Sequence, residues 1–452
     1  MAEITYICKR TVVSTKPIQP GTYCPFSVLD RQMEKKQIRI VCYYEWPKGK
    51  TEAGEITERL RESLSEVLTY FPKVTGRLMR NDKGHWKIKC NDAGVRMVEA
   101  RAKGSVDDWL QSVDRDKELM LVYWEEMFSK SYFWSTFYVQ VSICKEFEEG
   151  GLAIGLSCFH LLADPTCAAL FIKAWADTAL GRKMLSPPFF HPLPPRRPGN
   201  KIPSHEPYTA LIDHYKLSIE NSAPFTDAKH TTITLAFSDH TVQACMRMAQ
   251  LPPGPNNPDL SPFEALAGLF WVCVSKVKGL GNGLVNMSIC LDSRKVLGLD
   301  KGFFGNCTVY NKVHSAGTDE HRLPEAARAI GEVVAKMDCE GIMDLLEWLE
   351  RNDSESPTVT NTCDLICANL EVGSANSTEF LEGLKPIRVS CHVEPVFGIG
   401  QVLICQAPSN EGPLGRVVMV TLPEDEVLKL CEDELILQLS PTILMGVKKN
   451  HA

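Results

Sequence analysis

Hydrophobic and polar positions follow a clear pattern in the middle of the first half of the chain. Residues 152–158 alternate larger apolar side chains with small ones and carry no charge on either face. A strand of this kind is expected to be buried on both sides. Just beyond its end stands His160, and apolar residues then recur at helical spacing from Cys167 to Trp175. The pattern predicts a buried strand, a turn and a helix, with Gly181 ending the helix.

In both halves of the chain, segments with the two-residue period of a strand alternate with segments that have the 3.6-residue period of a helix, which indicates a mixed α/β protein. The predicted strands are residues 4–7, 38–44, 76–79, 85–89, 232–237, 284–291, 402–405 and 417–422. The predicted helices are residues 55–71, 241–249, 262–277, 325–337, 343–350 and 424–431, with polar loops at 351–362 and 371–380.

A proline-rich stretch divides the chain. Residues 187–198 contain too many prolines for regular structure, because proline fixes φ and removes a backbone donor. A chain of 452 residues is also too long for one compact core. We therefore predict an N-terminal domain at 1–188, a crossover linker at 189–228 and a C-terminal domain at 229–452.

Composition excludes several classes of partner. The net charge of −7 is spread along the chain without a run of five like charges, which disfavours nucleic acid and anionic membranes. No apolar run reaches the roughly 18–20 residues of a membrane span. The N-terminus lacks the apolar region of a secretory signal, so the 17 cysteines are expected to be reduced thiols. They show no zinc spacing, and we expect no metal site.

His160 and Asp164 are the candidate chemical residues. A histidine followed at the fourth position by aspartate is weak evidence alone, because it arises easily by chance. At a strand-to-helix junction, however, an imidazole is well placed to act as a general base near neutral pH. The alternative is structural, since Asp164 before Pro165 makes a good helix N-cap and first-turn pair.

Four further motifs accompany His160-x-x-x-Asp164 in order along the chain. Together the five resemble landmarks of the plant BAHD acyl-CoA-dependent acyltransferases. The other four are Phe71-Pro-Lys-Val-Thr-Gly-Arg-Leu78, Ser261-Pro-Phe-Glu-Ala-Leu-Ala-Gly-Leu-Phe-Trp271, Asp292-Ser-Arg294 and Gly302-Phe-Phe-Gly-Asn306.

This resemblance implies an architecture and a reaction. The fold would be two similar domains like that of chloramphenicol acetyltransferase, each a mixed sheet covered by helices, with a channel between them. His160 would take a proton from a hydroxyl or amine acceptor that attacks acyl-CoA, while Asp164 would pair structurally with Arg294. Acyl-CoA would be a co-substrate beside a small-molecule acceptor, with no bound cofactor. A cytoplasmic monomer is expected.

The chain departs from this family in two places. The second family signature, Asp-Phe-Gly-Trp-Gly, is here Val396, Phe397, Gly398, Ile399 and Gly400. Where many relatives carry Thr-Ser-Trp lining the acceptor pocket, this chain has Ala368, Asn369 and Leu370. Ala368 and Leu370 bring no side-chain donor for an oxyanion, so Asn369 or a backbone amide would have to substitute.

These departures resemble the eceriferum, wax-related branch of the family. That resemblance implies a second hypothesis, a non-catalytic partner of the fatty-acid elongase condensing enzyme, peripheral at the endoplasmic reticulum. The motifs do not separate the two functions. Three further candidates, His392, Phe303 and Phe304, are interpreted as core residues rather than as site residues.

Overall fold

The computed structural model describes most of the chain, and every statement below concerns these residues. They are 4–16, 18, 21–45, 53–112, 114–127, 131–144, 150–195, 209–220, 229–250, 260–280, 283–314, 323–352, 364–370, 372–396, 398–408 and 411–446. Contacts divide the chain into two compact units. The first comprises Met1–Leu193, Asp300–Cys307 and Val372–Pro395, and the second comprises Pro194–Leu299, Thr308–Glu371 and Val396–Ala452.

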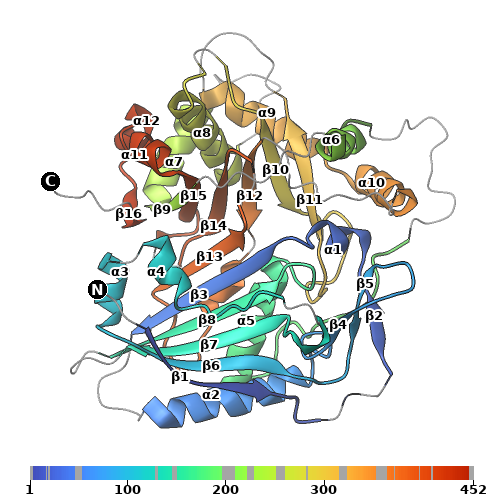
Figure 1. Ribbon diagram of the computed structural model, residues 1–452. Coiled ribbons are helices and arrows are strands. Elements are labelled where there is room, and N and C mark those ends of the chain that lie inside the picture. Colours follow the sequence, from blue (N-terminus) through green and yellow to red (C-terminus); the bar gives the residue numbers. More distant parts are fainter. Residues whose placement is uncertain are drawn as a thin grey trace. The chain divides into compact units, whose positions relative to one another are not determined.

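A six-stranded sheet organises the first unit (Figure 1). Neighbouring strands within this sheet are antiparallel, apart from the parallel pair β6 (Val95–Ala102) and β7 (Phe137–Cys144). In spatial order the strands are β1 (Ile4–Val12), β6 (Val95–Ala102), β7 (Phe137–Cys144), β8 (Gly151–Phe159), β3 (Gln37–Glu45) and β13 (Arg388–Glu394). Every residue of β8 is buried, as its sequence predicts, although both of its neighbours run antiparallel to it.

Helices and a small sheet complete the first unit. Helices α2 (Ala53–Leu68) and α5 (Pro165–Ala179) pack together, and Trp175 Nε1 donates to the Leu60 carbonyl at 3.1 Å. On the sheet itself, Ser157 Oγ donates to the Tyr123 carbonyl at 2.5 Å, which fastens a loop across β8. The elements are α1 (Val28–Gln32), α2 (Ala53–Leu68), α3 (Val106–Ser112), α4 (Arg115–Leu119), η1 (Ser131–Phe133), α5 (Pro165–Ala179), η4 (Gly373–Ser377), and the sheet β2 (Tyr23–Pro25), β5 (Trp86–Lys89) and β4 (Arg77–Arg80).

The second unit holds a seven-stranded mixed sheet. Its order is β11 (Thr308–Val313), β10 (Met287–Asp292), β12 (Leu365–Leu370), β14 (Gly400–Gln406), β15 (Arg416–Pro423), β9 (His230–Phe237) and β16 (Thr442–Met445). The helices are α6 (Thr209–Glu220), α7 (Asp239–Ala249), α8 (Pro262–Val277), α9 (Leu323–Lys336), α10 (Cys339–Arg351), α11 (Glu424–Cys431) and α12 (Glu434–Leu439). Helix α8 is buried all round from Ala265 to Ser275, and a Ser261–Glu264 capping box fixes its start.

The mixed α/β class and the two sheet-rich units confirm the predicted fold class. Within the predicted linker at 189–228, residues 209–220 form helix α6, which buries Leu211, Ile212 and Tyr215. In addition, residues 300–307 and 372–395 lie in the stretch predicted as the second domain but pack with the first unit. The reason for 372–395 is that β13 extends the first sheet by pairing with β3.

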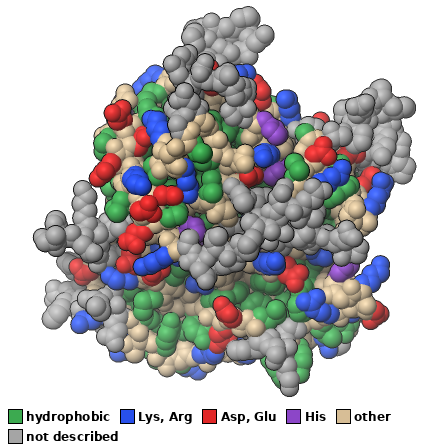
Figure 2. Space-filling view, turned by 45° about the horizontal axis from the view of Figure 1, so that its top comes forward, with side chains coloured by type: hydrophobic (Ala, Val, Ile, Leu, Met, Phe, Trp, Pro, Cys, Tyr) green, Lys and Arg blue, Asp and Glu red, His purple; other side chains and the backbone are tan. Residues whose placement is uncertain are grey.

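On the face drawn in Figure 2, acidic and basic side chains are interspersed. No helix within the described ranges has the length and apolar character to cross a membrane. Among the same residues, no three His, Cys, Asp or Glu side chains are grouped so as to hold a metal ion.

Candidate active site around His160

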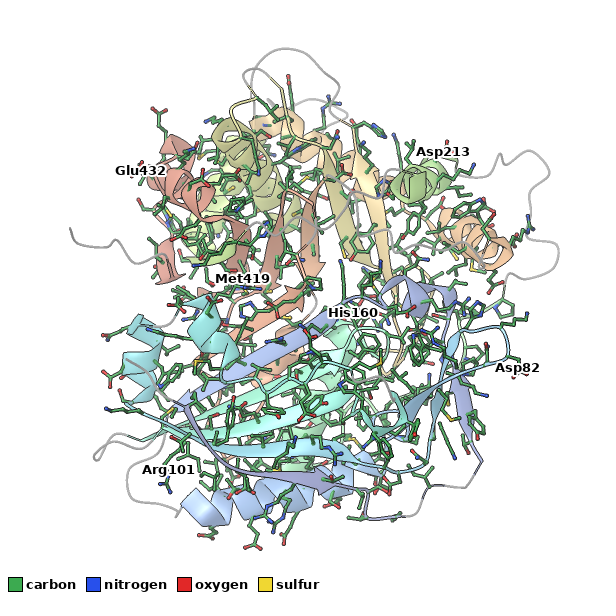
Figure 3. The ribbon with its side chains drawn as sticks, viewed as in Figure 1. Asp82, Arg101, His160, Asp213, Met419 and Glu432 are labelled. Atoms are coloured by element: carbon green, nitrogen blue, oxygen red, sulfur yellow. The ribbon has the colours of Figure 1, made fainter. Side chains whose placement is uncertain are left out.

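His160 directly follows β8, beside the residues that precede β3 and β7, and Figure 3 labels its position. The last residue of β8, Phe159, pairs with Gln37 and donates its N–H to the Thr136 carbonyl at 3.0 Å. The His160 N–H then donates to the Lys36 carbonyl at 2.9 Å, one step past the last pair of the ladder. The antiparallel register of β3 and β8 therefore sets the position of the histidine backbone.

The carbonyl of His160 is held as firmly as its N–H. Asn306 is fully buried, and its Nδ2 donates to the His160 oxygen at 2.8 Å and to Asp30 Oδ1 at 2.8 Å. Asp30 Oδ1 also accepts the backbone N–H of Asn306 at 2.8 Å. Its other oxygen accepts the Ser27 N–H in the capping box of α1. The start of α1 thus supports the peptide that carries the imidazole.

Burial decides the charge of this imidazole. The His160 side chain is 2% exposed, and its Nδ1 has no hydrogen-bond partner among the residues described. Burial, and to a smaller extent the charge of Lys36, lower the pKa of His160 to about 4, and the charge of Asp164 partly opposes them. Lys36 is itself only 3% exposed. His160 is therefore a neutral imidazole at physiological pH.

Asp164 begins helix α5. Its Oδ1 accepts the Cys167 N–H at 2.9 Å, and Pro165 occupies the first turn, which confirms the N-cap interpretation. Its Oδ2 accepts the Cys307 N–H at 3.1 Å. One carboxylate therefore joins the helix to a segment far along the chain. Burial and the charge of Asp164 also raise the pKa of the Cys158 thiol, which keeps it protonated.

The landmark Gly302–Asn306 has a packing role beside α5. Its backbone pairs with that of Phe189, which donates to the Gly302 carbonyl at 2.8 Å and accepts from Phe304 at 2.9 Å. A Cβ on Gly302 would lie 2.0 Å from the Pro187 carbonyl oxygen, so only glycine fits. The Phe304 ring makes edge contacts with Phe71 at 5.4 Å between centroids. Phe303 and Phe304 are both nearly fully buried, which confirms the prediction that they are core residues.

Arg294 belongs to the second unit, whereas Asp164 belongs to the first. Arg294 follows β10 and is 7% exposed. Its backbone N–H donates to Asp292 Oδ1 at 2.9 Å, and its Nη1 donates to Asp292 Oδ2 at 2.6 Å. These two bonds account for the Asp292-x-Arg294 spacing, and the pairing of Arg294 with Asp164 stays a prediction.

The altered second signature leads into strand β14. Val396 is half-buried, Phe397 lies outside the described residues, and Gly398 adopts φ +71° in a turn with Ile399. Gly400 starts the strand with φ +150°, and a Cβ there would lie 2.3 Å from Leu422 Cδ2. The glycines that this chain retains are therefore those the backbone needs.

The Ala368-Asn369-Leu370 stretch ends strand β12. Ala368 and Leu370 are buried on one face of the strand. Asn369 projects from the opposite face, which it shares with Leu365 and Cys367 of the second unit's core. Asn369 therefore lies on the other face of the strand from positions 368 and 370, and the role of Asn369 or of a backbone amide as a substitute donor stays a prediction.

His392 is a satisfied core residue, as predicted. It is 4% exposed, and its Nε2 lies 2.8 Å from Oε2 of the fully buried Glu118. Tyr43 and Ser390 donate to the other carboxylate oxygen at 2.9 and 2.8 Å. Burial alone would raise the pKa of Glu118, but Arg388 and the hydrogen bonds lower it to about 2.

Sequence reasoning missed three residues that shape the site: Lys36, Asp30 and Asn306. A capping-box signature, Ser27-x-x-Asp30, marks α1 but does not reveal the partner of its aspartate. Asn306 ends a recognised landmark without an assigned role. The register of β3 against β8 is what brings Lys36 to His160, and no local pattern encodes it.

Comparisons with known proteins agree over the length of the chain. The model described as "Transferase family" matches residues 2–435. "Protein ECERIFERUM 26-like" of Arabidopsis thaliana is 27% identical over an alignment of 435 residues, which covers 93% of this chain and 92% of that protein. Rosmarinate synthase of Plectranthus scutellarioides is 30% identical over 320 residues, 69% of this chain and 72% of the relative.

Two solved structures share the fold. Vinorine synthase has a TM-score of 0.70 at 19% identity, covering 98% of this chain and 100% of its own. F. sporotrichioides TRI101, complexed with coenzyme A and T-2, has a TM-score of 0.72 at 16% identity, covering 94% and 100%. These likenesses confirm the fold class expected from the sequence.

Proposed function

Because the chain belongs to the Transferase family of BAHD acyl-CoA-dependent acyltransferases, we propose that it moves an acyl group from acyl-CoA to a hydroxyl or amine acceptor. His160 is the proposed general base. The observation that carries this role is a neutral, buried imidazole whose own peptide is fixed through both its N–H and its carbonyl.

The proposed reaction needs no protein nucleophile. The acceptor oxygen or nitrogen attacks the thioester carbonyl, and its proton becomes strongly acidic as the new bond forms. An imidazole with a pKa of about 4 is always unprotonated at neutral pH and takes the proton at that stage. When the carbon–sulfur bond breaks, the imidazolium returns the proton to the sulfur of coenzyme A. The TRI101 complex with coenzyme A supports acyl-CoA as the co-substrate of this fold.

Substitution of His160 tests the proposal. We expect His160→Ala and His160→Gln to lower acyl transfer by about 10²–10⁴-fold, the usual contribution of a positioned base. The measurement is release of free coenzyme A from a panel of acyl-CoA donors with hydroxyl and amine acceptors. His240→Ala, at an exposed position of α7, is the matched control. Undiminished transfer by the folded His160 variants would exclude the mechanism.

A second function has its own support. The ECERIFERUM 26 proteins of Arabidopsis match this chain over more than nine-tenths of its length, and positions 368 and 370 carry no side-chain donor. The second candidate is therefore a non-catalytic partner of the fatty-acid elongase condensing enzyme at the endoplasmic reticulum. Co-expression with a condensing enzyme should then lengthen the acyl products, and His160→Ala should leave that shift unchanged. Unaltered chain length on co-expression counts against the partner role.

A further inference from the structure

Two cysteines in the small sheet of the first unit lie side by side. Cys24 is on the edge strand β2, and Cys90 directly follows β5. Cys24 pairs with Ile88, and the Cys90 N–H donates to the Thr22 carbonyl at 3.0 Å, so the two thiols share one face of the sheet. Their sulfur atoms are 3.7 Å apart.

From this juxtaposition we propose that Cys24 and Cys90 form a redox modification site, at which a disulfide oxidant such as oxidised glutathione converts the two thiols into a cross-link. A disulfide bond is about 2.05 Å long, so the sulfurs need to close by less than about 2 Å. Strand β2 is three residues long and paired on one side only, which leaves it able to make this adjustment.

The two thiols have the unequal environments that exchange chemistry requires. Cys24 is partly exposed, whereas Cys90 is 2% exposed. The hydrogen bond with Cys90 has the largest effect on Cys24 and, together with the smaller effect of the Lys73 charge, lowers the pKa of Cys24 to about 6 although burial opposes it. The pKa of Cys90 is raised by the same pairing. Cys24 is thus the accessible thiolate, and Cys90 is the resolving thiol.

The exchange balances in two steps. The Cys24 thiolate attacks one sulfur of glutathione disulfide, and a glutathione thiolate leaves. Cys90 then loses its proton and attacks the Cys24 sulfur, and the second glutathione leaves as a thiolate. Two electrons pass from the protein to the oxidant, which yields one protein disulfide and two reduced glutathiones.

The position of the pair gives the cross-link a structural consequence. Strand β2 runs directly into the Ser27 N-cap of α1, the helix whose Asp30 holds Asn306. Closing the bond would fix β2 to β5 and constrain the start of α1. The proposal does not depend on acyl transfer, and its test does not use activity.

Thiol counting after incubation in glutathione redox buffers tests the site. Oxidation should remove two of the 17 thiols, measured by alkylation in denaturant, and peptide mass spectrometry should recover Cys24 linked to Cys90. Cys339→Ser, at an exposed thiol, is the matched control and should still lose two. Cys24→Ser should lose none, and Cys90→Ser should carry one glutathione on Cys24.

The pH dependence of alkylation provides a second readout. In the full chain Cys24 should react with iodoacetamide with a midpoint near pH 6, and Cys90→Ala should move that midpoint upward because the thiol donor is gone. The proposal is overturned if oxidation leaves Cys24 glutathionylated without a link to Cys90, or if another pair closes first.

Discussion

The charge of a buried imidazole depends on a few neighbours, and at His160 the cationic neighbour that lowers the pKa is Lys36. Burial has the largest effect on the pKa of His160, and the Lys36 cation adds repulsion that disfavours a second positive charge. The Lys36 carbonyl, which accepts the His160 N–H, is unaffected by a side-chain substitution. A substitution of Lys36 can therefore remove the cation without removing the backbone hydrogen bond that positions His160.

Lys36→Met should raise the pKa of His160 from about 4 toward its ordinary value of 6.5 without reaching it, because burial remains. Titration of ¹³C-labelled histidine by NMR measures the change, with the His160 signal assigned by its loss in His160→Gln. Lys35→Met removes an exposed lysine next in sequence and is the matched control. An unchanged His160 midpoint in Lys36→Met would exclude the electrostatic role of Lys36.

At the residue scale the sequence identifies a candidate base, His160, but not the residues that surround it. His160 can be found from the strand before it and from the family landmarks. Lys36 and Asn306 are far from it in the chain and reach it through strand register and a buried amide. Their residue types have many other uses in proteins, so no spacing rule singles them out.

Among the elements, helix α5 depends on Asp164 for more than its first turn. An N-cap substitution to alanine costs about 0.5–2 kcal/mol. Asp164 also accepts the Cys307 N–H, which is buried and would lose its acceptor. The cost of truncating this side chain should therefore exceed that of an ordinary cap.

Asp164→Ala should destabilise the first unit by about 2–4 kcal/mol, the sum of a lost cap and an unsatisfied buried donor. Asp164→Ser should recover about 1 kcal/mol, because serine caps the helix without reaching Cys307. Asp114→Ala removes another aspartate N-cap of the same unit, at α4, and is the control. The measurement is the urea midpoint, and equal losses in Asp164→Ala and Asp114→Ala would contradict the second role.

Periodicity predicts the elements well where it is local and strong. Strand β8 and helix α8 follow directly from their apolar patterns. The sequence places residues 209–220 in the predicted linker because the proline run before them dominates the composition, although Leu211, Ile212 and Tyr215 form a buried face of helix α6. A short amphipathic helix between polar segments gives little periodic signal beside such a run.

At the scale of the whole molecule, the two units are not two halves of the sequence. Residues 300–307 join the first unit through hydrogen bonds to Phe189, Asp30 and Asp164, and 372–395 join it through β13. Long-range pairing of this kind is invisible to composition and periodicity. The proline-rich stretch marks the first crossing of the chain between the units but gives no sign of the later ones.

Among the described residues, His160 in the first unit and His214 in the second are buried histidines whose titration opposes folding in acid. Burial lowers the pKa of His160 in the first unit to about 4, and burial with Lys312 and His314 does the same for His214 in the second. Unfolded histidine titrates near 6.5, so between these values the unfolded chain binds more protons than the folded one. Stability is therefore present above pH 6.5 and is lost as the pH falls to about 4.

The loss can be assigned to its unit by hydrogen exchange. As the pH falls from about 7 to about 5, each histidine should lower the free energy of unfolding of its unit by about 2 kcal/mol. The protection of the slowest amides against exchange should then fall about twentyfold, after correction for intrinsic exchange rates. His160→Gln should remove this pH dependence from peptides of the first unit, and His214→Gln from those of the second. Glu118 does not interfere, since its pKa is lowered to about 2 and its own loss begins only below 4.5.

Two comparisons make this prediction decisive. His240→Gln removes an exposed imidazole from the second unit and should leave the pH dependence as in the unmodified chain. The double variant His160→Gln, His214→Gln should remove the pH dependence of protection from both units. The two effects should add, because the two groups are far apart in the chain and share no partner among the described contacts. If first-unit peptides keep their full pH dependence in His160→Gln, the imidazole titrates freely in the folded state. It would then lack the buried, neutral environment on which its role as a base rests.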